Sequence, residues 1–94
     1  MAAYQNLSEE ELSVLLQNGD KQAFTEIYDR FFKVLFLHAV KRLRDEDEAR
    51  DLVQELFSLL WLKRESIIIK TNLSNYLYTS IRNGVFNFIA KQKV

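Results

Sequence analysis

The stretch that decides the fold covers residues 45–61 and reads DEDEARDLVQELFSLLW. Its apolar residues recur every three or four positions, which is the period of an amphipathic α-helix. They are Ala49, Leu52, Val53, Leu56, Phe57, Leu60 and Trp61. Asp51, Gln54 and Glu55 are also three and four apart, so they share one exposed face of the same helix. The stretch therefore predicts a long helix with an apolar face toward the core and an acidic face away from it.

The acidic face has two interpretations that the spacing leaves open. A charged helix face commonly does no more than keep the helix in solvent. Lysine would serve that purpose equally well, whereas this face carries two carboxylates and an amide in succession, beside Arg50. The second interpretation is a docking surface for a basic partner.

Length and composition favour a small helical domain. The chain has 94 residues, no proline and two glycines, which suits one domain of long uninterrupted helices. The absence of cysteine excludes disulfide and thiolate chemistry and fits a cytoplasmic protein. The polar, acidic N-terminus is not a signal peptide, and no apolar run is long enough to span a membrane, so we expect no membrane partner.

Charge alternates in blocks along the chain, although the formal net charge is zero. Residues 1–29 and 45–55 each carry six acidic and one basic side chain. Residues 30–44 carry five basic and no acidic side chains, and residues 56–94 carry six basic and one acidic. Either opposite faces meet different partners, or the blocks neutralise each other between neighbouring helices.

Capping residues mark the remaining helices. Ser8 and Glu11 form a capping box at the start of a short helix that ends at Gly19. Asp20 begins a long helix whose apolar period continues to Leu43. A capping residue at position 45 then starts the central helix, which runs to about residue 64.

The last third predicts a loop and a fourth helix. Three successive isoleucines, residues 67–69, have high β propensity but no second strand to pair with, so we expect an ordered loop that packs them against the helices. Residues 73–90 again have the helical period, with Gly84 in the middle, where it would allow close helix packing. The fold class is therefore all-α, a compact bundle of one short and three long helices with an ordered loop before the last.

The sequence offers no catalytic constellation, so we expect no enzyme and no cofactor. His38 is the only histidine and there is no cysteine, which leaves neither a zinc site nor a nucleophile–base pair. A half-buried structural histidine is the expected role. The acidic residues at positions 45–51 fit helix caps better than an acid–base pair.

The polar face of the last helix has the composition of a nucleic-acid surface. Its outward residues are Tyr76, Tyr78, Thr79, Arg82, Asn83, Phe86 and Asn87. Aromatic rings stack on bases, and amides and arginine bond base edges. A mixed core-and-surface helix is the alternative.

Three segments together resemble the extracytoplasmic-function group of bacterial sigma-70 factors. They are LSVLLQNGDKQAFTEIY (residues 12–28), DEARDLVQELF (residues 47–57) and NYLYTSIRN (residues 75–83). Their order and spacing match the start, the core-polymerase-binding helix and the promoter-reading helix of region 2 of that family. The residues of these motifs are most similar to those of factors from Bacteroidetes-type bacteria.

The resemblance implies partners and roles for particular residues. The partners are core RNA polymerase, through the clamp coiled coil of its beta-prime subunit, and the non-template strand of the promoter −10 element. An anti-sigma factor could cover the same faces. The implied polymerase-binding residues are Asp51, Leu52, Gln54, Glu55 and Phe57. The implied DNA-binding residues are Ser66, Lys70, Asn72, Tyr76, Tyr78, Thr79, Arg82 and Asn83, with the loop of residues 66–72 cradling a flipped-out base.

The chain departs from the family pattern in three places. The family usually has tryptophan at the position of Tyr76 and often a basic residue at that of Thr79. These two differences affect how strongly the domain is expected to melt the DNA strands. The basic C-terminal segment contains only two cations, Lys91 and Lys93, which is fewer than usual in the family. The −35-reading helix-turn-helix domain that normally follows is absent from residues 1–94. The chain is either a fragment, which is the interpretation we favour, or a naturally short relative.

Because counterion release contributes much of DNA affinity, a domain without net charge should bind promoter DNA weakly unless it is on the polymerase. The rival interpretation is a helical protein–protein adaptor whose acidic helix meets another basic partner. Under that interpretation, Asn83→Ala leaves the function of the domain unchanged, whereas a sigma factor would lose open-complex formation.

Overall fold

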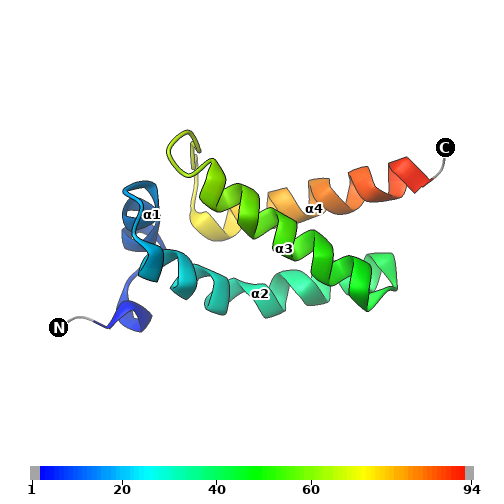
Figure 1. The fold of residues 1–94 in the computed structure, drawn as a ribbon, viewed down its shortest axis with the longest axis horizontal. Coiled ribbons are helices and arrows are strands. Elements are labelled where there is room, and N and C mark those ends of the chain that lie inside the picture. The colour runs from blue at the N-terminus through cyan, green and yellow to red at the C-terminus, as the bar shows by residue number, and fades with distance from the viewer. Residues whose placement is uncertain (1–2, 93–94) are drawn as a thin grey trace.

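The computed structural model describes residues 3–92 and contains only helices within that range (Figure 1). A single turn, η1 (Tyr4–Asn6), precedes four α-helices. These are α1 (Glu9–Gln17), α2 (Lys21–Leu43), α3 (Glu46–Leu62) and α4 (Leu73–Gln92). The prediction of an all-α bundle with one short and three long helices is confirmed.

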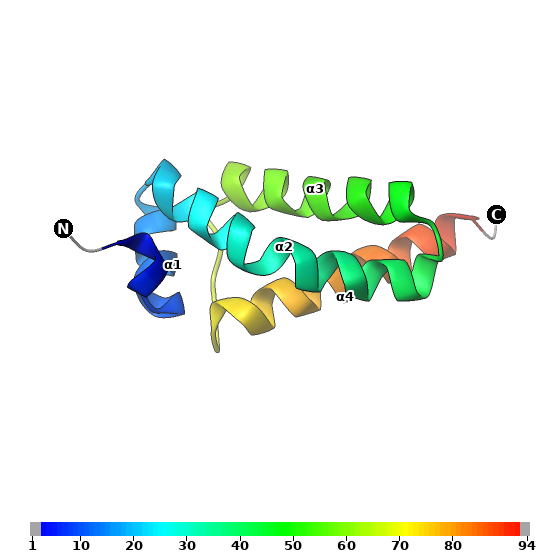
Figure 2. The same ribbon diagram turned by 90° about the horizontal axis from the view of Figure 1, so that it is seen from below.

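The three long helices pack against each other along the long axis of an elongated domain. α2 and α4 run in the same direction and α3 runs in the opposite one (Figures 1 and 2). α1 lies across the end where α2 begins. With α2, α3 and α4 at the corners of a triangle, each pair of helices forms one side of the domain.

Side-chain caps define the helix boundaries that the sequence predicts. Ser8 and Glu11 form the reciprocal capping box of α1. The Asp20 and Asp45 carboxylates accept backbone N–H bonds at the starts of α2 and α3. Gly19, with φ +85°, adopts the left-handed conformation that ends α1 and turns the chain into α2.

The core is a continuous apolar cluster contributed by all four helices. An aromatic group inside it joins α2 to α3: the Phe57 ring centroid lies 4.8 Å from that of Tyr28 and 6.4 Å from that of Phe24. Trp61 extends this group, 5.2 Å from Phe24. These contacts fix α3 firmly on α2.

The loop between α3 and α4 only partly follows its prediction. Ile67 and Ile69 pack against the core as expected, but Ile68 is 77% exposed, so the expectation that all three isoleucines are packed is wrong. In an extended segment successive side chains point to opposite sides, which excludes the middle one. The Gln17 amide donates a 3.0 Å hydrogen bond to the Ile67 carbonyl and ties the loop to α1.

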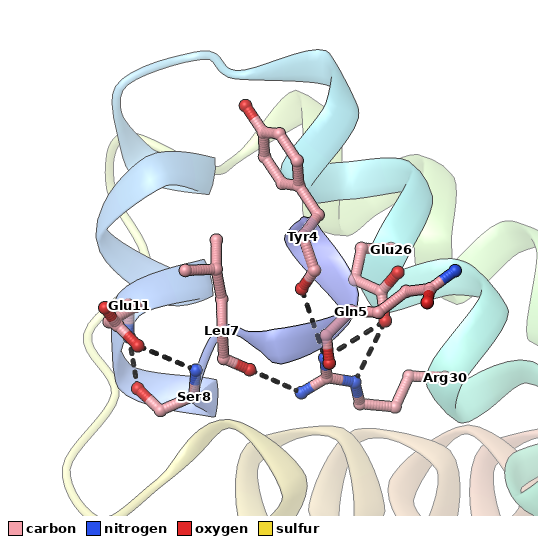
Figure 3. A network of polar contacts seen from close by, with 7 residues as sticks. All are labelled: Tyr4, Gln5, Leu7, Ser8, Glu11, Glu26 and Arg30. Atoms are coloured by element: carbon pink, nitrogen blue, oxygen red, sulfur yellow. Dashed lines mark hydrogen bonds and ion pairs between the residues drawn. The ribbon is translucent and has the colours of Figure 1, made fainter. Parts of the chain in front are cut away.

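Arg30 fastens the N-terminal segment to α2 (Figure 3). Its guanidinium donates to the carbonyls of Leu7, Gln5 and Tyr4, at 3.1, 3.3 and 3.5 Å, and pairs with Glu26 at 3.0 Å. The planar fork of arginine suits several acceptors at once. The segment before α1 is thereby held by one side chain.

Candidate functional site

The acidic face of α3 is free of internal partners. Asp51, Gln54 and Glu55 are exposed, and none of the three makes a side-chain hydrogen bond or ion pair within residues 3–92. Other carboxylates have internal partners, as Asp20 does in capping α2 and Glu26 in binding Arg30. The face therefore presents two carboxylates and an amide to solvent.

Phe57 does not lie on this face, so its expected place among the polymerase-binding residues is corrected. Only 1% of the side chain is exposed, because the ring packs among the aromatic residues of α2. Leu52 is half-buried and remains on the accessible side of α3. The 3.6-residue period places Phe57 inward, with Val53 and Leu60.

A groove of about 440 Å³ runs between α3 and α4. It brings together Leu52 and Glu55 from α3 with Tyr76 and Asn83 from α4. Its floor is close-packed: a Cβ added to Gly84 would lie 3.1 Å from Leu52 Cδ1. This contact confirms the prediction that glycine at position 84 allows α3 and α4 to approach closely.

The DNA-binding residues expected on α4 divide between two sides of the helix. Tyr76 is half-buried against the core and, with Asn83, lines the groove beside α3. Tyr78, Thr79 and Arg82 are exposed outside that groove. A helix presents residues three to four apart on one face, so a set spread over eight positions covers a wide convex surface rather than a single stripe.

The expected DNA-binding residues of the loop are exposed, and two of them also have structural roles. The Asn72 Oδ1 accepts from the Asn75 backbone N–H at 2.8 Å and so caps α4. The Ser66 hydroxyl donates to the Lys63 carbonyl at 3.1 Å. Lys70 has no such bond among the described residues.

Two residues of α1 that sequence patterns missed hold this region in place. Glu9 Oε1 accepts from the Ser74 backbone N–H at 2.9 Å, at the first turn of α4. The Gln17 amide binds the loop carbonyl described above. Each contact joins residues 50 or more positions apart, so no local spacing indicates it. The groove-lining residues Lys63 and Lys91 were also not predicted as site residues, whereas Asn87, which lines the groove as well, was expected on the polar face of the last helix.

The charge blocks do not neutralise each other through ion pairs between helices. Within residues 3–92 the two ion pairs are Arg30–Glu26 and Arg50–Asp47, and each lies inside one helix. The alternative of acidic and basic faces turned toward different partners therefore fits the structure better.

Residues 27–94 match the family model for sigma-70 region 2. The chain belongs to this family. It is similar to the ECF RNA polymerase sigma factor SigW of Bacillus subtilis (strain 168), with 28% identity over 78 residues. The match covers 83% of the chain and 42% of that relative, so the chain spans less than half the length of the curated relative. No solved structure matches the chain significantly.

This sigma-70 region 2 domain is of the extracytoplasmic-function type, as its motifs predict. The family acts in transcription initiation and is a family of transcription factors, not of enzymes. No helix among residues 3–92 has the combination of length and hydropathy needed to cross a membrane.

Proposed function

We propose that this domain binds core RNA polymerase through α3 and reads the promoter −10 element with α4 and the loop before it. The observation that carries the proposal is the unpartnered acidic face of Asp51, Gln54 and Glu55 beside the groove that also holds Asn83. The partner of α3 in this proposal is the basic clamp coiled coil of the beta-prime subunit.

The chemistry of α3 supports a basic protein partner. The Asp51 and Glu55 carboxylates are exposed and unpaired, so a partner's lysine or arginine can bind them without breaking an internal contact. Leu52 and Leu56 line the adjoining groove and offer apolar area next to the charges. Acidic charge around an apolar strip is suited to a basic helix.

The chemistry of α4 supports single-strand recognition. Asn83 is exposed and has no hydrogen-bond partner among the described residues, so its amide is free to read a base edge. Thr79 lies one helical turn before Asn83, Tyr78 and Arg82 are exposed outside the groove, and the loop supplies Ser66, Lys70 and Asn72. Tyr76 supports this surface from its half-buried position. We assign residues 1–94 to one region 2 domain.

The test of polymerase binding is a titration of the domain against the isolated clamp coiled coil. Asp51→Arg with Glu55→Arg should weaken binding by about 100-fold, because two attractive charges become repulsive. The matched control is Glu10→Arg with Asp29→Arg, which makes the same net charge change at two exposed carboxylates outside α3. Equal loss in both variants would mean a non-specific charge effect, and no binding by the folded wild-type domain would favour the adaptor.

The test of promoter reading uses the domain bound to core polymerase and a non-template −10 oligonucleotide. Asn83→Ala should lose oligonucleotide capture by about tenfold while polymerase affinity stays unchanged. The free domain should bind the same oligonucleotide weakly, in keeping with its zero net charge. Tight binding of promoter duplex by the free domain at physiological salt would contradict this division of roles.

A further inference from the structure

Helix α1 is tied to both ends of the loop that connects α3 to α4, and the two segments lie at the same end of the domain (Figures 1 and 2). Gln17, the last residue of α1, donates its amide N–H to the Ile67 carbonyl at 3.0 Å. Glu9, the first residue of α1, accepts from the Ser74 backbone N–H at 2.9 Å. The two ends of one helix therefore hold the two ends of the segment 67–74.

α1 is a rigid spacer between these two contacts. Its nine residues place the first and last Cα atoms about 12 Å apart. Leu12 and Leu16 are buried in the core and fix α1 on the other helices. After α1, a Cβ on Gly19 would lie 3.8 Å from Arg64 Nε, and the Arg64 guanidinium stacks on Trp61 at 4.1 Å from the ring centroid. The positions of the loop ends are thus set by a part of the protein outside the loop.

Between the two contacts the loop has few attachments of its own. Among the described residues, no backbone N–H group of residues 68–72 donates to another backbone group. Ile69 packs against the core, whereas its neighbours Ile68 and Lys70 are exposed. A segment with so few contacts depends on its end points for a defined conformation.

The Glu9 contact also reaches Asn72, one of the residues proposed to bind DNA. Asn72 Oδ1 accepts from the Asn75 backbone N–H at 2.8 Å and from the Ser74 hydroxyl at 2.9 Å. Ser74 joins Glu9 to Asn72, because its backbone N–H binds the former and its hydroxyl binds the latter. With Oδ1 engaged by two donors, the Asn72 amide has a fixed orientation.

We infer that Glu9 and Gln17 are positioning residues for promoter reading, which hold residues 67–72 in the conformation that meets the non-template strand. Neither side chain contacts the strand in this role. The inference rests on the proposed function and gives α1 a part in DNA reading that its three glutamates do not suggest. Apparent affinity falls with the fraction of molecules in the competent conformation, so a loosened loop weakens capture although every DNA contact residue is still present.

The first test measures the loop itself. Glu9→Met with Gln17→Met keeps side chains of similar length and high helix propensity but removes both hydrogen bonds. Hydrogen exchange at the Ser74 amide should accelerate by about tenfold, and the NMR order parameters of residues 68–71 should fall. The amides of α3 should stay protected.

The second test measures promoter reading with the chain bound to core polymerase. The probes are non-template −10 oligonucleotides that each carry one abasic position, so a loss of affinity identifies a base that the protein reads. Asn83→Ala should abolish the effect of abasic positions read by α4. Glu9→Met with Gln17→Met should leave those positions unchanged and should reduce the effect of an abasic position elsewhere in the strand by about tenfold. Polymerase affinity should stay the same.

Two controls separate positioning from charge and stability. Glu10→Met with Asn18→Met makes the same kinds of substitution at adjacent exposed positions and should match the wild type in both tests. Glu9→Gln loses the charge but keeps an acceptor oxygen, so it should retain wild-type reading. Each single methionine substitution should show part of the effect and replaces the double variant if that variant does not fold.

Several results would overturn the inference. They are wild-type exchange at Ser74 in the Glu9 and Gln17 variant, wild-type responses to every abasic position, an equal loss at all positions, and the same effect in the Glu10 and Asn18 control. Absence of oligonucleotide capture by the wild type on polymerase would refute the proposed function and this inference with it. Wild-type capture together with an unaltered variant would refute the inference alone.

Discussion

Truncating Phe57 tests whether this residue belongs to the core or to a binding surface. The ring is 1% exposed and lies 4.8 to 6.5 Å, between centroids, from the rings of Tyr28, Phe24 and Phe32. Removing a buried phenyl group in Phe57→Ala costs about 3–5 kcal/mol of unfolding free energy, since both transfer and cavity terms are lost. Each aromatic contact contributes about 0.5–1.5 kcal/mol beyond area burial, which favours the upper part of that range.

The size of this effect relative to total stability decides how the assay is run. A domain of this length has an unfolding free energy of about 5–14 kcal/mol, so Phe57→Ala approaches the limit of folding. Phe57→Leu keeps most of the volume and should cost about 1–2 kcal/mol, which leaves a folded protein for binding measurements. Urea unfolding followed by circular dichroism measures both variants.

The control and the binding assay distinguish the two assignments. Phe86→Ala removes the same ring from a 73% exposed position and should change stability by less than about 0.5 kcal/mol. Phe57→Leu should bind the clamp coiled coil as the wild type does. The core assignment fails if Phe57→Ala costs less than about 1 kcal/mol, or if folded Phe57→Leu loses clamp affinity.

Three further predictions concern other contacts. Gly84→Val should destabilise the domain by about 1–3 kcal/mol in urea unfolding, because its extra methyl groups press on Leu52, whereas destabilisation no greater than that of Gly84→Ala would refute the close approach. Burial and neighbouring positive charges should hold the pKa of His38 below 6.5, as measured by NMR. The unfolded state then takes up a proton first, so stability falls as pH drops below about 6.5, and His38→Gln should remove that part of the pH dependence. Arg30→Lys keeps the charge but not the fork, so hydrogen exchange at the Leu7 amide should accelerate while core amides of α3 stay protected; unchanged exchange there would contradict the anchoring role.

Local signals predict the helices of this domain well, because the forces that set helix ends are local. Ser8, Asp20 and Asp45 cap backbone groups within three residues of themselves, so their spacing in the sequence is the spacing of the contact. The helical period likewise separates inward from outward positions on α3 and identifies most of the core.

The remaining differences arise where a family motif includes a buried position, or where a contact depends on tertiary arrangement. Phe57 lies inward by its period, and only a family motif placed it with the binding residues. Tyr76 is polar at one end and apolar at the other, so the pattern alone does not decide its burial. The Glu9 bond to the start of α4 spans 65 positions, and only the folded chain brings those residues together.

Residues 45–55, at the start of α3, carry six acidic side chains and one basic one, whereas residues 30–44, in α2, carry five basic side chains and no acidic one, so the charge of this molecule is unevenly distributed although its net charge is zero. A uniform attraction toward a charged partner is therefore weak, but a partner's field exerts a torque on the domain. Rotation before contact brings α3 toward a basic surface, which raises the fraction of productive encounters. The association rate should thus fall as added salt shortens the Debye length, even though the zero net charge by itself predicts no dependence of that rate on salt.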